Sequence, residues 1–260
     1  MGVTPHLTGC SGGAALRLDR WRPAPSMLFN SYIFVFAFLP IVLLGYVAIG
    51  KWRGRGAAIL WLVVASLIYY GWWQPELAGG QKTGFLDGLF EGWWWNPRYV
   101  LLLIFSAIVN FSLGSKISDP KESDAHRKRM LILGVAFNLF IIGYFKYSNW
   151  FIDQVNRATG AGLSLGQIVL PIGMSFFTFQ QIAYLADAWA GKAREYNFRD
   201  YLLFVTFFPQ LIAGPIVHHS EMLPQFERRG RYRLEPLNMS IGITIFAIGL
   251  FKKVVIADEV

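Results

Sequence analysis

The feature that most constrains this chain is a series of long apolar runs that charged residues hardly interrupt. Of its 260 residues, 54% are hydrophobic and 15% are charged, whereas soluble domains carry about 25% charged residues. Several runs approach the ~17–25 residues with which a helix crosses a bilayer. A core helix of a soluble protein would need a charged outer face, and these runs have none. The sequence therefore predicts an all-α polytopic membrane protein.

The apolar runs predict five membrane-spanning helices, one broken segment and a last apolar stretch. The spans are expected at about residues 32–49, 57–73, 99–114, 130–151 and 168–189, the broken segment at 201–217 and the last stretch at 237–256. Pro40 predicts a kink in the first span, because proline lacks the amide hydrogen that a helix uses. Residues 1–26 lack both periodicity and the apolar core of a secretory signal. They are interpreted as a disordered or mis-annotated leader before a true start at Met27.

The basic residues predict the orientation of the spans. The loops at 51–55, 115–129, 191–199 and 227–233 hold 3, 5, 3 and 4 Lys or Arg residues, and those at 74–98 and 153–167 hold 2 and 1. Since basic loops remain in the cytoplasm, the start of the first span is expected to face outward. The loops at 191–199 and 227–233 then share one side, so residues 201–217 should enter the membrane and return. Pro209, Gly214 and Pro215 provide the breaks that such a re-entrant segment needs. The same alternation puts Lys252 and Lys253 near the outer face, where snorkelling, a cavity or a tilted helix would each explain them.

Charge and cysteine content exclude other classes of protein. The net charge is +8, but the basic residues alternate with apolar runs, so the expected partner is the lipid bilayer and not nucleic acid. The single cysteine, Cys10, excludes a disulfide within the chain, and no histidine pair has metal-site spacing, so no metal is expected. Trp93–Trp95 are interpreted as an interfacial anchor, with a carbohydrate-stacking platform as the alternative.

Polar residues gather between Leu170 and Phe226, where lipid would make them expensive. The candidates for lining a substrate path are Gln180, Gln181, Asp187, Gln210, His218 and His219. Such groups persist at membrane depth only against protein or a wet cavity. On a helix, Gln180, Tyr184 and Asp187 would share one face, which can point at the re-entrant bend. The two histidines can act as general bases near neutral pH, or they can be interfacial residues at the cytoplasmic boundary.

Four stretches resemble a known family. They are Met27-Leu28-Phe29-Asn30-Ser31, LPIGMSFFTFQQIAYLAD at 170–187, FFPQLIAGPIVHHSEMLPQF at 207–226 and GLFKKVVIAD at 249–258. Over about residues 27–260 the chain resembles the membrane-bound O-acyltransferases (MBOAT), in their bacterial alginate O-acetyltransferase-like branch. The resemblance implies a ring of tilted helices around a funnel, with re-entrant segments lining a thin partition. This chain would form the N-terminal portion of that ring.

The resemblance also implies a reaction in the bacterial inner membrane. An acyl group, often acetyl, would pass from a cytoplasmic thioester donor such as acetyl-CoA to hydroxyls of an exported polysaccharide or of a partner protein. The implied partners are periplasmic or membrane proteins of polysaccharide acetylation, and no bound cofactor is implied. A transporter and a non-catalytic membrane scaffold are the alternatives, although no internal repeat favours the transporter.

The resemblance does not locate a catalytic residue in this sequence. The essential histidine of the family is expected in a later Trp-His-Gly-like motif, and none of His6, His126, His218 and His219 has that context. The catalytic residue is therefore unknown and is expected beyond Val260. The chain by itself is expected to be inactive, and His218 and His219 are interpreted as lining.

Overall fold

The computed structural model describes residues 31–72, 97–164, 168, 170–171, 173–192, 197–211, 214, 222, 224–226 and 235–257. Within these residues every regular element is a helix, and five helices have the length and apolar character to cross a membrane. Those five are Phe34–Arg53, Arg55–Trp72, Pro97–Ser118, Asp124–Thr159 and Pro236–Ala257. The predicted all-helical polytopic class is thus confirmed. The expected leader at 1–26, Met27, Trp93–Trp95, His218 and His219 lie outside the described residues.

The first span contains a widened turn where a kink is expected. A π-helix, η2 (Phe34–Phe38), leads directly into α1 (Leu39–Arg53). The amide of Leu39 donates to the carbonyl of Phe34, five residues back. Pro40 follows in the first turn of α1, and its ring would crowd the carbonyl four residues before it in a regular α-helix. The wider turn accommodates the proline without breaking the span.

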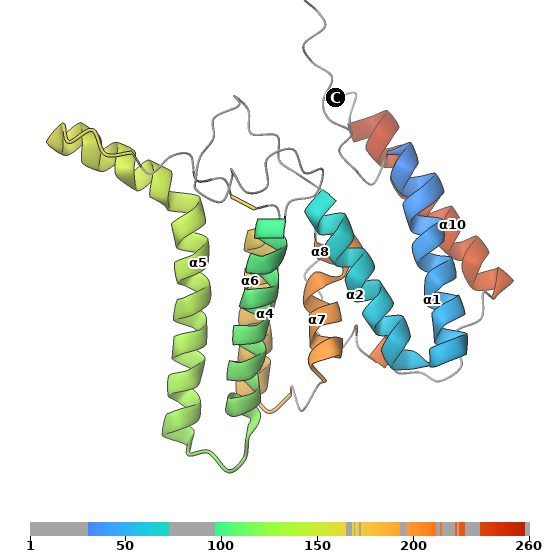
Figure 1. The fold of residues 1–260 in the computed structure, drawn as a ribbon, viewed down its shortest axis with the longest axis horizontal. Helices are drawn as coiled ribbons and strands as arrows, with labels where there is room; N and C mark the ends of the chain where they lie inside the picture. Colours follow the sequence, from blue (N-terminus) through green and yellow to red (C-terminus); the bar gives the residue numbers. More distant parts are fainter. Residues whose placement is uncertain are drawn as a thin grey trace, which may run out of the picture.

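The long helices that follow α1 in the sequence are α2 (Arg55–Trp72), α4 (Pro97–Ser118) and α5 (Asp124–Thr159). The Ser123 hydroxyl accepts from the amide of His126 and caps the start of α5, and Gly160 at φ 67° ends it. The 36 residues of α5 extend about 54 Å at the α-helical rise, well beyond the ~30 Å hydrocarbon core of a bilayer. Figure 1 shows that α5 bends away from the other helices toward its C-terminal end.

Three shorter helices follow: α6 (Met174–Trp189), α7 (Phe198–Thr206) and α8 (Phe208–Leu211). The fifth span is expected from residue 168, but α6 begins at Met174, because Gly173 at φ 68° turns the chain just before it. As far as Leu211, the segment expected to be re-entrant forms α7 and α8, with the break at Phe207. With nine and four residues, neither helix can cross a bilayer of ~30 Å. Their path into and out of the membrane stays a prediction, as does the funnel.

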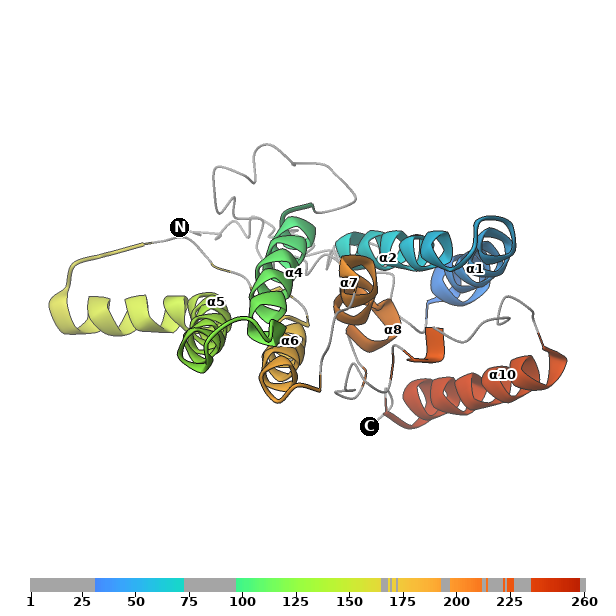
Figure 2. The same cartoon turned by 90° about the horizontal axis from the view of Figure 1, so that it is seen from below.

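The helices form a row that runs from α5 through the pair α4 and α6, then α7 with α8, to α2 and α1 (Figures 1 and 2). The last helix, α10 (Pro236–Phe251), continues as the π-helix η3 (Lys252–Ala257), and Figure 2 shows it apart from this row. None of its residues is buried. Phe246 is half-buried and packs against the core, and most of the remaining surface of α10 is exposed within the described part of the chain.

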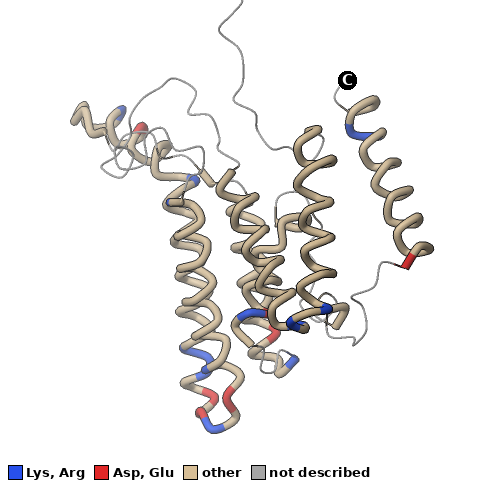
Figure 3. Tube along the Cα trace, turned by 45° about the vertical axis from the view of Figure 1, so that its right-hand side comes forward, with Lys and Arg blue, Asp and Glu red and all other residues tan. Residues whose placement is uncertain are grey.

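Charged residues concentrate at one end of the row. Figure 3 shows Lys and Arg where α1 turns into α2, where α4 turns into α5 and where α6 leads to α7. These are the loops at 51–55, 115–129 and 191–199, three of the four basic loops that are predicted to lie on one side of the membrane. Basic residues near the C-terminal end of α10 and η3 lie at the opposite end. Which end faces the cytoplasm stays a prediction.

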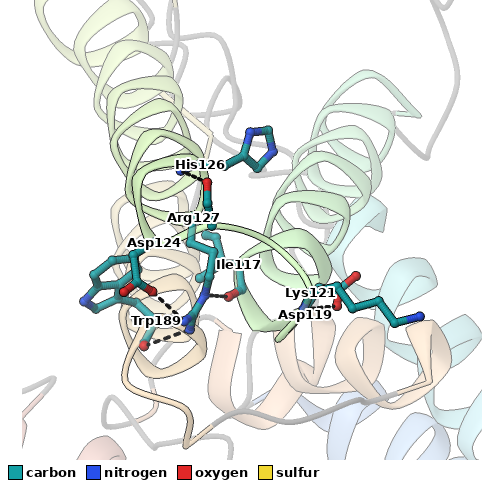
Figure 4. A network of polar contacts seen from close by, with 8 residues as sticks. Ile117, Asp119, Lys121, Asp124, His126, Arg127 and Trp189 are labelled. Atoms are coloured by element: carbon teal, nitrogen blue, oxygen red, sulfur yellow. Dashed lines mark hydrogen bonds and ion pairs between the residues drawn. The ribbon is translucent and has the colours of Figure 1, made fainter.

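A single arginine joins three helices at the charged end (Figure 4). The Arg127 Nε donates to the carbonyl of Ile117 at 2.7 Å, and its guanidinium donates to the carbonyl of Trp189 at 3.5 Å. The guanidinium also lies 5.3 Å from the Trp189 ring centroid and 3.3 Å from the carboxylate of Asp124. The last carbonyls of a helix have no donor within that helix. Arg127, from the first turn of α5, therefore caps the ends of both α4 and α6.

A glycine lets α4 and α6 approach closely. A Cβ atom at Gly114 would lie 2.7 Å from the Cζ and Oη atoms of Tyr184, so the ring occupies the space that any other residue would need. Small residues allow this kind of approach between membrane helices. The position of α6 against α4 therefore depends on Gly114.

Substitution of Gly114 by leucine is expected to separate α4 from α6. Overpacking of this kind lowers the free energy of unfolding by about 1–3 kcal/mol, which thermal unfolding in detergent micelles would measure. Gly249→Leu on α10 is the matched control, because a Cβ there meets no atom within 4 Å. Equal thermal midpoints for the two variants would contradict the packing argument.

Candidate functional site

Buried amide side chains join α4, α5 and α6 in the interior. The Ser106 hydroxyl and the Asn110 amide both donate to Gln181 Oε1, at 2.7 and 2.8 Å. Asn110 and Asn138 each donate from Nδ2 to the other's Oδ1. All four side chains are at most 1% exposed. Gln181, a candidate for lining a substrate path, is thus held in a network among three helices.

Gln180 lies on the neighbouring face of α6 and contacts α7. Its Nε2 donates to the carbonyl of Phe204 at 3.4 Å. One turn later on α6, the ring of Tyr184 packs against that of Tyr201 with centroids 4.5 Å apart. The two helices are therefore antiparallel here. The face that the sequence predicts for Gln180 and Tyr184 points at α7, the first half of the predicted bend. Asp187, on the same stripe, is half-buried.

Gln210 lies in α8, directly after the break at Phe207. The amide of Phe208 donates to the Ser66 hydroxyl of α2 at 3.2 Å, so α2 supplies a partner to a backbone group that the break leaves free. On the other side, a Cβ at Gly173 would lie only 2.6 Å from the carbonyl oxygen of Leu211. The short helix is thus fixed between α2 and the start of α6, and Gln210 is 7% exposed there.

Four buried polar atoms have no hydrogen-bond partner within the described part of the chain. They are Gln180 Oε1, Gln181 Nε2, Tyr201 Oη and Gln210 Nε2, and all belong to α6, α7 or α8. An unpaired buried polar group costs about 1–3 kcal/mol, so its persistence calls for an explanation. Amides and a phenol can hydrogen-bond a carbonyl or a hydroxyl, but an amide cannot act as a general base.

An ion pair holds the start of α7 against α2. The guanidinium of Arg55 lies 2.9 Å from the Asp200 carboxylate, and its Nε donates to the carbonyl of Phe226 at 3.1 Å. The Asp200 side chain is 8% exposed and that of Arg55 35%. A carboxylate this deeply buried needs a partner, and Arg55 provides it while also fixing the chain at Phe226.

Sequence reasoning missed several of these residues. Arg55 counts there only as a loop charge, and Asp200 and the two asparagines are not singled out. A signal exists for Asn110 and Asn138, because each is an isolated amide within an apolar run and such residues bond across membrane helices. His218 and His219 lie outside the described residues. Among the described residues, no group of three or more His, Cys, Asp or Glu could hold a metal ion.

Replacing Gln181 by methionine is expected to destabilise the α4–α5–α6 contact. The donors of Ser106 and Asn110 would lose their shared acceptor, and the free energy of unfolding would fall by about 1–3 kcal/mol. Gln154→Met on α5, a half-buried position with no described hydrogen bond, controls for the change in side chain. Thermal unfolding in micelles measures both, and an unchanged midpoint for Gln181→Met would refute a structural role for the network.

Comparison with known proteins identifies relatives over most of the chain. The family profile described as MBOAT, membrane-bound O-acyltransferase family, matches residues 112–259. The chain is 38% identical over 259 aligned residues to the peptidoglycan O-acetyltransferase of Helicobacter pylori, covering 90% of this chain and 45% of that protein.

Two further relatives are the probable alginate O-acetylases AlgI of Pseudomonas syringae pv. tomato and Pseudomonas putida. They are 35% and 36% identical over 237 residues, covering 89% of this chain and 40% and 43% of theirs. The chain thus spans less than half the length of these relatives. No solved structure matches it.

Proposed function

Since the chain belongs to the membrane-bound O-acyltransferase family, we propose that it acts in acetyl transfer to hydroxyl groups of a polysaccharide outside the cytoplasm. The observation that carries this proposal is the 38% identity to a protein named for peptidoglycan O-acetylation. The similarity to probable alginate O-acetylases points to the same chemistry on a different polymer. The names of these relatives share one reaction, acetyl transfer to a hydroxyl of a polysaccharide.

The reaction exchanges one acyl bond for another. The oxygen of the acceptor hydroxyl attacks the carbonyl carbon of a thioester donor such as acetyl-CoA. The carbon–sulfur bond breaks, an ester forms, and the hydroxyl proton passes by way of a general base to the leaving thiolate. The proposed base is a histidine that these 260 residues do not include, with His218 and His219 as lining. The proposed donor side is the cytoplasm and the proposed location the bacterial inner membrane, with polysaccharide-acetylation proteins as partners.

Four of the described residues are proposed to line the path of the acyl group, and we call them the wall. Gln180, Gln181 and Gln210, with Asp187 at the end of the α6 stripe, are the proposed lining. Three of the four unpaired polar atoms belong to these glutamines. A neutral amide can orient an acyl carbonyl or a hydroxyl without introducing a charge that lipid would oppose. That these three amide atoms have no partner among the described residues supports a role toward substrate.

Deletion of the gene in its own bacterium tests the proposed activity. Ester-linked acetate would be measured separately in peptidoglycan and in secreted polysaccharide, after mild alkaline release. Loss of acetate from one of these polymers, restored by the intact gene, is expected and would also identify the acceptor. Unchanged acetate in both polymers would overturn the proposal.

The Gln210→Leu variant, expressed from a gene copy in the deletion strain, tests whether Gln210 lines the acyl path. Loss of one hydrogen bond to the acyl group is expected to lower acetate by up to about tenfold, equivalent to ~1.4 kcal/mol. Stability should stay equal or rise, because the substitution removes an unpaired buried amide. Gln154→Leu serves as the control, and thermal unfolding accompanies the acetate assay. Loss of stability together with loss of activity would show a structural role instead.

A further inference from the structure

The outer part of α5 presents a surface that the proposed acyl transfer does not use. From Met130, directly after the basic Arg127–Arg129, to Lys146 the helix rises about 24 Å. Lys146 therefore lies near the far side of a hydrocarbon core of ~30 Å. The helix continues to Thr159, and Figure 1 shows that this end bends away from the row. At the same rise, the last turns of α5 would lie beyond the hydrocarbon.

Large aromatic side chains are exposed at this depth. They are Tyr144, Tyr147, Trp150 and Phe151, exposed by 46%, 54%, 61% and 62%. Tyrosine and tryptophan concentrate at membrane–water interfaces, where an apolar ring meets a polar edge. Their position along α5 agrees with the depth that the helical rise gives for Lys146. Two independent observations thus place this surface at headgroup level.

A hollow of about 280 Å³ opens on this surface, lined by Gly143, Tyr147, Ser148, Trp150, Phe151 and Ile152. Gly143 leaves it open, because a Cβ there would meet no atom within 4 Å. The Lys146 ammonium lies 5.5 Å from the Tyr147 ring centroid, and no carboxylate of the described residues pairs with it. An apolar hollow and a cation with no carboxylate partner among the described residues therefore lie side by side.

The chain itself covers a different face of the same helix. The side chain of Asn149 exchanges two hydrogen bonds with the backbone of Ile168, at 2.8 and 3.2 Å. Asn156 does the same with Leu163, at 2.7 Å for both bonds. Asn149 and Asn156 are seven residues apart and so share one face, away from Gly143 and Tyr147. Leu163 and Ile168 are thus held on that face and not over the hollow.

We propose that this hollow binds one phospholipid of the leaflet opposite the basic loops. An acyl chain would lie over Gly143, between Tyr147 and Phe151, and the phosphate would pair with Lys146. A phospholipid supplies both an acyl chain for the apolar hollow and a phosphate for the cation, so charge complementarity favours it as the occupant. The proposal stands independently of the acyl-transfer activity.

Native mass spectrometry of the purified chain, titrated with phosphatidylglycerol, tests the site. Gly143→Leu fills the hollow, and Lys146→Gln removes a lysine–phosphate contact of about 1 kcal/mol, or roughly fivefold in affinity. Both variants are expected to weaken binding at least that much. Gly242→Leu on α10 is the matched control, since a Cβ there also meets no atom within 4 Å. Wild-type affinity in both Gly143→Leu and Lys146→Gln would overturn the proposal.

A nitroxide attached to Phe151→Cys in a Cys10→Ser background gives a second measurement in bilayers. Its collision rates with oxygen and with a water-soluble nickel complex report depth, and a Leu139→Cys label, on an exposed position in the middle of α5, marks the hydrocarbon. A depth between that label and bulk water is expected. A fully aqueous signal at position 151, or a cross-link from it to another protein with no loss of bound lipid, would overturn the proposal.

Discussion

The hydrogen-bonded amides between α4, α5 and α6 are the interaction on which the rest of this structure depends. Lipid offers no partner to Asn110, Asn138 or Gln181, so each must find one on another helix. Successive side chains on a helix point about 100° apart around its axis. Only one rotation of α6 about its own axis therefore brings Gln181 to Asn110. That rotation directs the adjacent Gln180 toward α7. The network inside one half of the row thereby orients the proposed wall in the other half.

Two arginines extend this order to the charged end of the helices. Arg127 caps α4 and α6 from α5, and Arg55 holds Asp200 at the first turn of α7. A helix as short as α7 cannot be positioned by matching its length to the bilayer. Its place is fixed by the ion pair at one end and by the Ser66 contact of Phe208 just beyond the other. The two arginines at this end thus contribute to the packing of the helices.

The sequence predicts the all-helical membrane class because the length and the low charge of an apolar run are local properties. It also predicts the common face of Gln180 and Tyr184, which follows from helical spacing alone. The start of α6 escapes it, because the turn at Gly173 is packed against Leu211 in a distant segment. The break falls at Phe207 and not at Pro209, since proline is tolerated within the first turn of α8. The partners of Gln181 escape for the same reason: Asn110 is 71 residues away, and no local pattern joins them.

The loop that follows α5 is attached through its backbone. Asn149 and Asn156 each offer both a donor and an acceptor, and each engages the amide and the carbonyl of one loop residue. Backbone groups are the same for every residue except proline, which lacks the amide hydrogen. The side chains at 163 and 168 can therefore vary widely while these two attachments are kept. In descendants of this gene the two asparagines would be the fixed points, and the loop itself the freely evolving surface.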